Sequence, residues 1–498
     1  MNAIIDTGLS PLIVPPKEEV VLALRAAVPP HCVLSREEDT RPYECDGLSL
    51  YRSLPMAVVL PETEAQVQNI LKVCKRLNVP VVARGAGTGL SGGAMPHAQG
   101  VLLGLAKFNQ IKQIDPVAAI AVVQPGVRNL AVSEAAAPFG LYYAPDPSSQ
   151  IACTIGGNVA ENSGGVHCLK YGLTIHNVLK VRMVTMEGDV VELGSLAPDS
   201  PGPDLLSVFV GSEGMLGVVT EVTLRLTPKP ALASVIMASF DDVEKASDAV
   251  GKIIGAGIIP AGLEMMDKQA TQMVEPFVKA GYDIDAEAIL LCESDGTTEE
   301  VAEELQRMEQ VFQRAGATRL QVSTSEAERL RFWAGRKNAF PAAGRVSPDY
   351  YCMDGTIPRR RLGDVLKAIQ GMETQFGLRC ANVFHAGDGN LHPLILFNSN
   401  IEDEVRRAED FGAAILELCV EVGGTITGEH GVGMEKINQM CVQFSRDELD
   451  MFMAVKRAFD PACLLNPEKV IPTLARCAEY GKMHVHGGAI PFPELPRF

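Results

Sequence analysis

The sequence lacks three features that would each point to a particular class of protein. None of its 12 cysteines is arranged as Cys-x-x-Cys, so the sequence encodes neither a ribbon-type zinc site nor an iron–sulfur cluster. No uninterrupted apolar stretch reaches the roughly 18 residues that a membrane-spanning helix needs. The N-terminus has no basic segment followed by the apolar core of a signal peptide. These absences favour a soluble, cytoplasmic protein.

Positive charge is also scarce. Lysine and arginine number 44 against 61 aspartate and glutamate residues, which gives a formal net charge of −17 spread along the chain. An acidic chain repels phosphate backbones and anionic headgroups, so we expect no nucleic-acid partner and no direct binding to anionic lipid. The 47% of apolar and 21% of charged residues are those of an ordinary globular protein.

Changes in the pattern of apolar residues divide the 498 residues into parts and predict an α+β fold. Residues 1–50 carry a short helical segment, and 51–229 contain a strand–helix–strand unit followed by short β runs. A Thr-Pro-Lys-Pro stretch marks the end of this second part. In 230–425, strands and helices alternate as in a ferredoxin-like α+β layer, with helices expected on one face of an antiparallel sheet. Residues 426–498 form a C-terminal segment.

Glycine-rich stretches recur beside the β runs of the second part. The first, 81–93, reads VVARGAGTGLSGG and contains a match to G-x-G-x-x-G. A Rossmann site needs a helix directly after this motif, but Pro96 and a new apolar run follow, so a Rossmann site is excluded. What remains is a strand that leads into a loop whose amides can approach phosphate oxygens. Two further stretches, 154–165 and 211–217, favour a cofactor site over a β-rich domain with many turns.

Two histidines flank a turn of hairpin composition. The sequence FHAGDGNLH places His385 and His392 on either side of Gly-Asp-Gly-Asn. With a four-residue loop at 387–390, the two histidines would lie directly opposite each other and share a face of the sheet. Two such imidazoles can reach one metal ion at about 2.1 Å each. The alternative is a pair of histidines that bond only to backbone.

Three more side chains are candidates for the same site. Glu429 lies in a Gly-Glu-His-Gly segment and could complete a two-histidine, one-carboxylate metal set, with His430 as a base. The alternative is a solvated loop. Arg336 lies between Trp333 and Phe340 on one helical face. A shielded arginine suits the binding of a carboxylate, although a surface arginine over apolar neighbours has the same pattern.

These segments together resemble a known family. The chain from about residue 40 onward is similar to the FAD-linked oxidases of the vanillyl-alcohol oxidase type, in the 2-hydroxy-acid dehydrogenase branch that includes the flavin subunits of bacterial glycolate oxidases. The motifs that carry this resemblance are RGAGTGLSGGA, PDPSSQIACTIGGNVAENSGG, GSEGMLGVVTEVT, FHAGDGNLHP and GEHGVG. The resemblance implies a PCMH-type FAD-binding domain of two subdomains over 51–229, a substrate (cap) domain over 230–425, and a C-terminal helical return to the FAD site.

The resemblance also implies roles for individual residues. His385, His392 and Glu429 match metal ligands, with Zn, Mn or Fe as the candidate ion, His430 matches the catalytic base, and Arg336 matches the substrate-carboxylate arginine. Covalent relatives place a histidine where Thr88 stands, so non-covalent FAD is implied. The implied FAD-binding residues are Arg84, Gly85, Ala86, Gly87, Thr88, Gly89, Leu90, Ser91, Pro145, Asp146, Thr154, Gly157, Asn158, Asn162, Glu213, Gly214, Gly217, Val219 and Asn466.

The expected function is the oxidation of a small 2-hydroxy acid, glycolate first and D-lactate second, to the 2-oxo acid. The resemblance implies two departures that favour a monoacid: a lysine that helps relatives bind larger diacids falls near Cys352 here, and their asparagine two residues after the second ligand histidine is Leu394. The resemblance implies partners in the same complex, an iron–sulfur subunit and a second FAD-binding subunit, which would pass electrons to quinone and supply any peripheral membrane association.

Three alternatives remain open at this point. One is a D-lactate or D-2-hydroxyglutarate dehydrogenase that acts without partners, and another is a flavin-dependent transferase similar to ether-lipid synthases. The third is a non-catalytic assembly subunit, which the full set of histidines and glutamate disfavours. His484 and His486 near the C-terminus could be ligands, but a solvated or partner-facing tail is the preferred interpretation.

Overall fold

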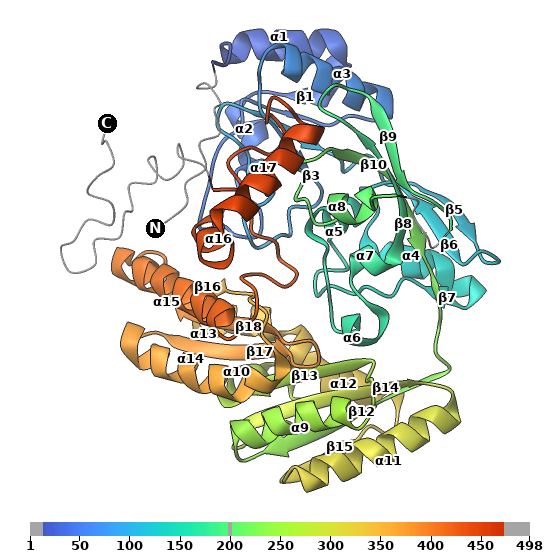
Figure 1. Cartoon of the computed structure of the whole chain (residues 1–498), viewed down its shortest axis with the longest axis vertical. Helices are drawn as coiled ribbons and strands as arrows, with labels where there is room; N and C mark the ends of the chain where they lie inside the picture. Colours follow the sequence, from blue (N-terminus) through green and yellow to red (C-terminus); the bar gives the residue numbers. More distant parts are fainter. Residues whose placement is uncertain (1–12, 198–201, 473–498) are drawn as a thin grey trace.

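The computed structural model describes residues 13–197 and 202–472, so His484 and His486 lie outside the described residues. The described chain forms three larger sheets and one two-stranded ribbon. In Figure 1 the first two sheets occupy one half of the molecule and the third sheet, with its helices, occupies the other. The α+β fold class is confirmed.

The first sheet is built on the expected strand–helix–strand unit. It has the order β1-β2-β4-β3, and β4 lies between β2 and β3 and is parallel to both. Thr63 caps the connecting helix by accepting a hydrogen bond from the Gln66 amide at 3.3 Å. The elements are α1 (Lys17–Ala27), β1 (Val33–Leu34), α2 (Glu37–Thr40), β2 (Ala57–Val59), α3 (Glu64–Arg76), β3 (Val81–Arg84) and β4 (Val101–Gly104).

The second sheet is antiparallel and has the order β5-β6-β10-β8-β9. Its strands are β5 (Ile111–Asp115), β6 (Ile120–Val123), β8 (Val178–Val184), β9 (Val190–Gly194) and β10 (Val218–Arg225). The helices of this region are α4 (Asn129–Ala136), α5 (Ile155–Glu161), α6 (Cys168–Tyr171), α7 (Thr174–Asn177) and α8 (Leu205–Phe209), and the ribbon pairs β7 (Leu141–Tyr142) with β11 (Thr227–Pro228). The first glycine stretch begins with β3, the second contains α5, and the third leads into β10.

The third sheet has seven antiparallel strands in the order β15-β12-β14-β13-β17-β18-β16. Its strands are β12 (Leu232–Phe240), β13 (Gly262–Asp267), β14 (Ala288–Gly296), β15 (Arg319–Val322), β16 (Asp349–Cys352), β17 (Arg379–His385) and β18 (Asn390–Phe397). Its helices are α9 (Val243–Gly255), α10 (Lys268–Val278), α11 (Thr298–Arg314), α12 (Glu326–Lys337), α13 (Ala339–Val346), α14 (Leu362–Phe376) and α15 (Glu402–Glu421).

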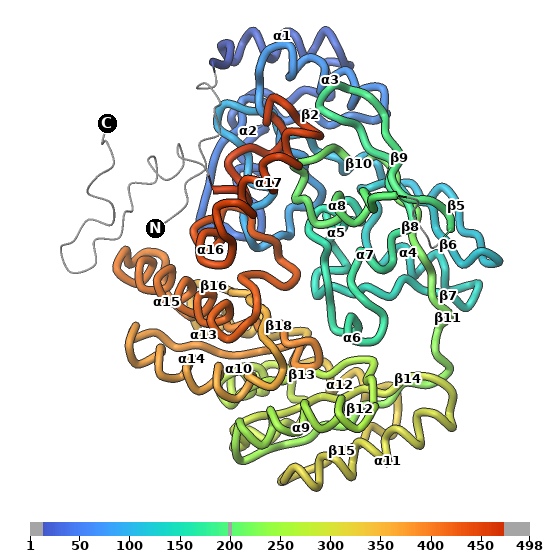
Figure 2. Tube along the Cα trace, viewed as in Figure 1, coloured from blue at the N-terminus to red at the C-terminus, as the bar shows by residue number. Residues whose placement is uncertain are grey.

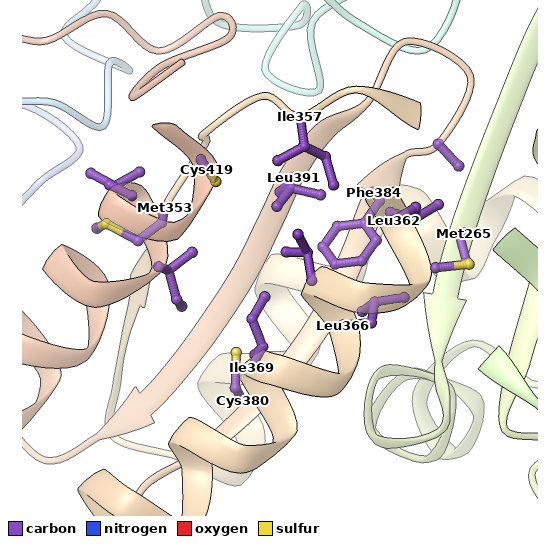
Figure 3. Packing of buried hydrophobic residues seen from close by; sticks show 14 of the residues in the cluster. Met265, Met353, Ile357, Leu362, Leu366, Ile369, Cys380, Phe384, Leu391 and Cys419 are labelled. Atoms are coloured by element: carbon purple, nitrogen blue, oxygen red, sulfur yellow. The ribbon is translucent and has the colours of Figure 1, made fainter. Parts of the chain in front are cut away.

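Helices cover both faces of this sheet, so the expectation of helices on one face is wrong. Successive residues of β14 alternate between two cores: Leu290 belongs to the core that includes residues of α9, α11, α14 and α15, whereas Leu291 belongs to the core that includes residues of α10, α12 and α13. Figure 3 shows the first of these cores, where Phe384 of β17 lies against Leu366 of α14. The strands are apolar on both faces, and such strands need cover on both.

The chain returns to the first half after the third sheet. Helices α16 (Ile437–Gln443) and α17 (Arg446–Phe459) follow α15 in Figure 2; α16 packs against α15, and Lys456 Nζ of α17 donates to the Met215 carbonyl in the first half at 2.6 Å. The chain then runs along the open edge of β3, where the Val81 amide donates to the Leu464 carbonyl and the Asn466 amide donates to the Val81 carbonyl, both at 2.8 Å. The expected domain boundaries at 50, 229 and 425 stay predictions.

No helix in the described part of the chain is both long enough and apolar enough to span a bilayer.

The contact between the C-terminal segment and the first glycine stretch predicts a test of the fold. Gly433 has φ +52°, and a Cβ on it would collide with the Ser91 carbonyl. We expect Gly433→Ala to lower the free energy of unfolding by about 1–3 kcal/mol. Gly251 in α9 faces open space, so Gly251→Ala should be neutral or should stabilise by up to about 1 kcal/mol. Thermal and denaturant unfolding of both variants measure the difference, and equal midpoints would contradict the described contact.

Candidate active site

The two histidines lie in the predicted hairpin, but in a different register. Strands β17 and β18 pair His385 with Asn390 and Val383 with His392, so the turn is 386–389 and the expected direct pairing of the histidines is wrong. The turn closes one residue earlier because Gly389, with φ +86°, supplies its left-handed position. A shift of two in the pairing keeps both side chains on one face. Their ring centroids are therefore only 4.9 Å apart.

Glu429 meets both imidazoles. Its Oε1 lies 3.3 Å from His385 Nε2 and 2.9 Å from His392 Nε2. The potential ligand atoms of the three residues all lie within 4.8 Å of one another, and all three side chains are largely buried. Two imidazoles and one carboxylate that converge in this way fit a divalent transition metal with open positions left for substrate. Hydrogen bonds between a carboxylate and two protonated imidazoles would give the same distances, so metal content decides between them.

A buried carboxylate that the sequence interpretation missed organises this set. Glu264 on β13 is 1% exposed; its Oε1 lies 2.7 Å from His385 Nδ1 and its Oε2 accepts from Arg336 Nε at 2.6 Å. Burial alone would lower the pKa of His385, but Glu264 outweighs burial and raises it. Because Nδ1 is taken by Glu264, Nε2 faces Glu429. A glutamate within the apolar run AGLEMM was the available signal, since buried acids are rare unless paired.

Arg336 is buried, so the surface alternative is wrong. Its residue exposure is 2%, and its Nη2 lies 3.4 Å from His385 Nε2. The guanidinium therefore lies beside both the Glu264 carboxylate and His385, at the face of the sheet that α12 covers. An arginine held by one carboxylate keeps further N–H groups for a second.

The loop that carries Glu429 and His430 is held by Asp354 and is not solvated. Asp354 Oδ2 accepts hydrogen bonds from the amides of Gly428, Glu429 and His430 at 3.0, 2.8 and 2.7 Å. Lys436 forms an ion pair with the same carboxylate, and both side chains are fully buried. Burial opposes ionisation, but Lys436 lowers the pKa of Asp354 to about 2. The loop geometry therefore depends on a carboxylate that stays charged.

His430 lies beside the histidine pair and is poised to accept a proton. Its ring centroid is 4.9 Å from that of His392. Burial lowers the pKa of His430 below its ordinary value, so the imidazole is neutral at neutral pH. Its Nδ1 is buried and has no hydrogen-bond partner among the described residues. A neutral imidazole with a free nitrogen can act as a base.

The glycine stretches and the C-terminal return meet on the other side of this loop. The carboxylate of Glu213 accepts hydrogen bonds from the amides of Val432 and Gly433, both at 2.7 Å. Asn466 Nδ2 donates to the carbonyls of Glu213 and Gly93 at 2.5 and 3.0 Å. The loop 427–433 therefore lies between the histidine set and the glycine-rich region.

The glycine-rich region fits a ligand with many hydrogen-bonding groups. Ser91 Oγ, Thr154 Oγ1 and Asn158 Nδ2 are buried and have no hydrogen-bond partner among the described residues. Such groups are rare without a bound partner. A Cβ on Gly85 would collide with Thr154 Oγ1, so the first two glycine stretches abut and only glycine fits there. FAD, with its pyrophosphate, ribose and ring heteroatoms, is a ligand of this kind.

The other residues expected to bind FAD differ in their surroundings, and several already have protein partners. Arg84 ends β3 and donates from Nη1 to the Cys45 carbonyl at 2.6 Å. Asp146 bonds His167, and Asn162 accepts from the Ile175 amide. Val219 is buried in the core of the second sheet. The residues whose FAD contact stays a prediction are Arg84, Gly85, Ala86, Gly87, Thr88, Gly89, Leu90, Ser91, Pro145, Asp146, Thr154, Gly157, Asn158, Asn162, Glu213, Gly214, Gly217, Val219 and Asn466.

The metal content of the protein tests which of two groups holds an ion, because a second group also has ligand atoms at metal-binding spacing. His31, Cys32 and Glu62 also place ligand atoms within 4.8 Å, but His31 is exposed and Glu62 already bonds Lys107 at 2.7 Å. We expect one ion per chain in the wild type and in His31→Ala, and loss of that ion in His392→Ala. Elemental analysis of protein purified without chelator measures this. An ion that persists in His392→Ala, or a wild type without metal, would contradict the assignment.

Family comparisons cover both halves of the molecule. Residues 55–194 match the FAD binding domain, and residues 229–470 match the FAD linked oxidases, C-terminal domain. The chain is 64% identical to "Glycolate oxidase subunit GlcD" of Escherichia coli (strain K12) over 97% of each chain. It is 39% identical to the protein of the same name from Bacillus subtilis (strain 168), over 87% of this chain and 93% of the relative.

A solved structure shares the fold. The structure of p-cresol methylhydroxylase with substrate bound superposes with a TM-score of 0.77 over 95% of this chain and 99% of that chain, at 18% identity. This likeness extends over the glycine-rich half and the seven-stranded half together. On the family matches and the sequence identity, the chain belongs to the FAD-linked oxidases.

Proposed function

We propose that this FAD-dependent oxidoreductase oxidises glycolate to glyoxylate, with D-lactate as a poorer substrate. The observation that carries the proposal is the convergence of Arg336, His430 and the His385–His392–Glu429 set on one side of a loop whose other side borders the glycine-rich region. A substrate placed there would have a cation for its carboxylate and a base for its hydroxyl. The name of the 64% identical relative supports glycolate as the substrate.

A flavin and a divalent metal would supply chemistry that no side chain provides. Bound FAD provides a two-electron acceptor for the hydride that leaves the substrate Cα. His385, His392 and Glu429 would hold a divalent metal, with Zn, Mn or Fe as candidates, and such an ion lowers the pKa of a hydroxyl. Ser91, Thr154 and Asn158 would bind FAD without a covalent bond, and Thr88 has no side-chain nucleophile of the imidazole type.

The protein's own groups bind the substrate and take its proton. Arg336, oriented by Glu264, would bind the substrate carboxylate, and the buried position keeps competing water away. His430 would accept the hydroxyl proton at Nδ1, which is free for it. The two electrons and one proton of the Cα–H bond would leave together as hydride to bound FAD, so each substrate oxidised would give one oxo acid, one protonated imidazole and two electrons on the flavin.

The surroundings of the site support a small monoacid. Cys352 and Leu394 are register partners on β16 and β18 and are both buried in the core that faces α12. Side chains that fill a core with apolar atoms cannot bind a second carboxylate. The alternative substrate D-2-hydroxyglutarate carries such a second carboxylate, so it is disfavoured.

Electrons need a route out of the reduced enzyme. The eleven cysteines of the described residues are all free thiols, and the described groups of metal-ligand spacing include no cluster of cysteines. We propose that an iron–sulfur subunit and a second FAD-binding subunit of the same complex accept the electrons and pass them to quinone. The complex would act in the cytoplasm, with peripheral membrane contact through those partners.

Anaerobic reduction of bound flavin tests the proposed reaction. We would mix the purified chain, loaded with FAD, separately with glycolate, D-lactate, L-lactate and D-2-hydroxyglutarate in the absence of oxygen. The oxidised-flavin absorbance should be lost fastest with glycolate, more slowly with D-lactate, and not with the diacid. Retention of the oxidised spectrum with all four acids would reject the reaction and would make the ether-lipid type of transferase the next function to test.

Substitution of His430 tests the proposed base. We expect His430→Gln to lower the rate of flavin reduction by glycolate by about 10²–10⁴-fold, the usual contribution of a positioned base. The affinity for FAD should stay the same. His31→Gln removes an exposed imidazole that contacts Glu62 and none of the proposed site residues; it is the matched control, and its flavin should be reduced at the wild-type rate. A His430→Gln variant that is as fast as the control would exclude His430 as the base.

A further inference from the structure

One histidine outside the proposed catalytic set bridges the two halves of the molecule. His167 directly precedes α6, in the glycine-rich half. Its Nδ1 lies 2.8 Å from Asp146 Oδ2 in the same half, and its Nε2 lies 3.2 Å from Glu293 Oε1 on β14 of the seven-stranded sheet. An imidazole between two carboxylates holds a proton on each nitrogen and is positively charged.

The charges at this bridge are strongly coupled. Burial opposes the charged form of His167, but the two carboxylates outweigh it and raise its pKa to about 10. Burial also opposes ionisation of Glu293, yet its cationic neighbours, His167 among them, lower its pKa to about 2. The His167 imidazolium is therefore charged throughout the neutral range. Without it, the carboxylates of Asp146 and Glu293 would face each other as two largely buried negative charges.

The second oxygen of Glu293 leads to the helix that carries Arg336. Glu293 Oε2 accepts from Arg329 Nη1 at 2.7 Å and from Trp333 Nε1 at 2.5 Å. Arg329, Trp333 and Arg336 are spaced i, i+4 and i+7 on α12, so they share one face of the helix. A continuous series of hydrogen bonds thus runs from Asp146, in the region expected to bind FAD, to the helix of the proposed substrate arginine.

We propose that His167 is a positioning residue that ties Asp146 to Glu293 across the two halves and thereby fixes α12 so that Arg336 faces the substrate site. This inference rests on the proposed function in one respect, the binding of the substrate carboxylate by Arg336. It assigns no chemical step to His167.

The same interface offers a matched control. Tyr171 OH donates to Asp295 Oδ2 at 2.6 Å, and Lys170 Nζ donates to the Asp295 carbonyl at 2.8 Å. Asp295 lies two residues after Glu293 on β14 and, unlike Glu293, has no hydrogen bond to α12 in the described residues. Tyr171→Phe therefore weakens the contact between the halves and leaves the series from Asp146 to α12 intact.

Three variants of the full-length, FAD-loaded enzyme test the inference. We expect His167→Gln and Arg329→Gln each to raise the KM for glycolate about tenfold, the loss of one charge-assisted hydrogen bond, with kcat little changed. KM should rise without a change in kcat because a misplaced Arg336 weakens the binding of substrate and transition state alike. Tyr171→Phe should keep the wild-type KM. The inference is overturned if His167→Gln and Arg329→Gln keep the wild-type KM, or if Tyr171→Phe raises it as much.

Hydrogen exchange separates a failure of this inference from a failure of the proposed function. If glycolate does not reduce the wild-type flavin, the proposed function fails, but the link between His167 and α12 can still be measured. Amide exchange over 326–337 should be faster in His167→Gln and Arg329→Gln than in the wild type and in Tyr171→Phe. Unchanged exchange in both variants would overturn the inference. Arg329 lies partly exposed, so its variant serves if His167→Gln does not fold.

Discussion

Two buried carboxylates, one from each half of the molecule, hold the loop 427–433, and the rest of the site depends on this. Asp354 accepts three successive amides at one end of the loop, and Glu213 accepts two at the other. A buried carboxylate is costly unless it is paired and hydrogen-bonded. Lys436 and the loop amides compensate Asp354, and the same amides would be unsatisfied without it. Asp354 therefore holds Glu429 and His430 beside the histidine pair, and Glu213 ties the far end of the same loop to the glycine-rich half.

The sequence predicts the local parts of this arrangement well. Strand–helix–strand units, the glycine stretches and the histidine hairpin are encoded by residues close together in the chain. The hairpin register fails by two residues because both Gly387 and Gly389 suit a turn, and composition does not tell which one takes the left-handed position. The histidines still share a face, since a shift of two preserves the alternation of side chains along a strand. Helices on both faces of the seven-stranded sheet could have been predicted, because its strands carry apolar residues on both faces.

The long-range partners could not be predicted in this way. Glu264 meets His385 across 121 residues of chain, Asp354 meets the 427–430 loop across more than 70, and His167 meets Glu293 across 126. Each of these partners is a single acidic or basic residue. The periodicity of the surrounding stretch would predict the same strand or loop if that residue were replaced. These residues pair because of how the sheets and loops pack in three dimensions, and a local sequence pattern carries no information about that packing. The family resemblance supplied the expected site but none of these supporting residues.

The return of residues 464–466 to the edge of β3 has a consequence for biosynthesis. Strand β3 is the last strand of its sheet, and its outer edge pairs with residues that leave the ribosome nearly 400 positions later. An unpaired edge is a template for association with other chains. The nascent protein thus carries an open edge at its first glycine stretch until residues 464–466 are synthesised, and Asn466 and Lys469 then donate to the Gly93 carbonyl of that stretch. The N-terminal half therefore exposes this edge during synthesis, and the region expected to bind FAD takes its described form only after residues 464–466 have been added.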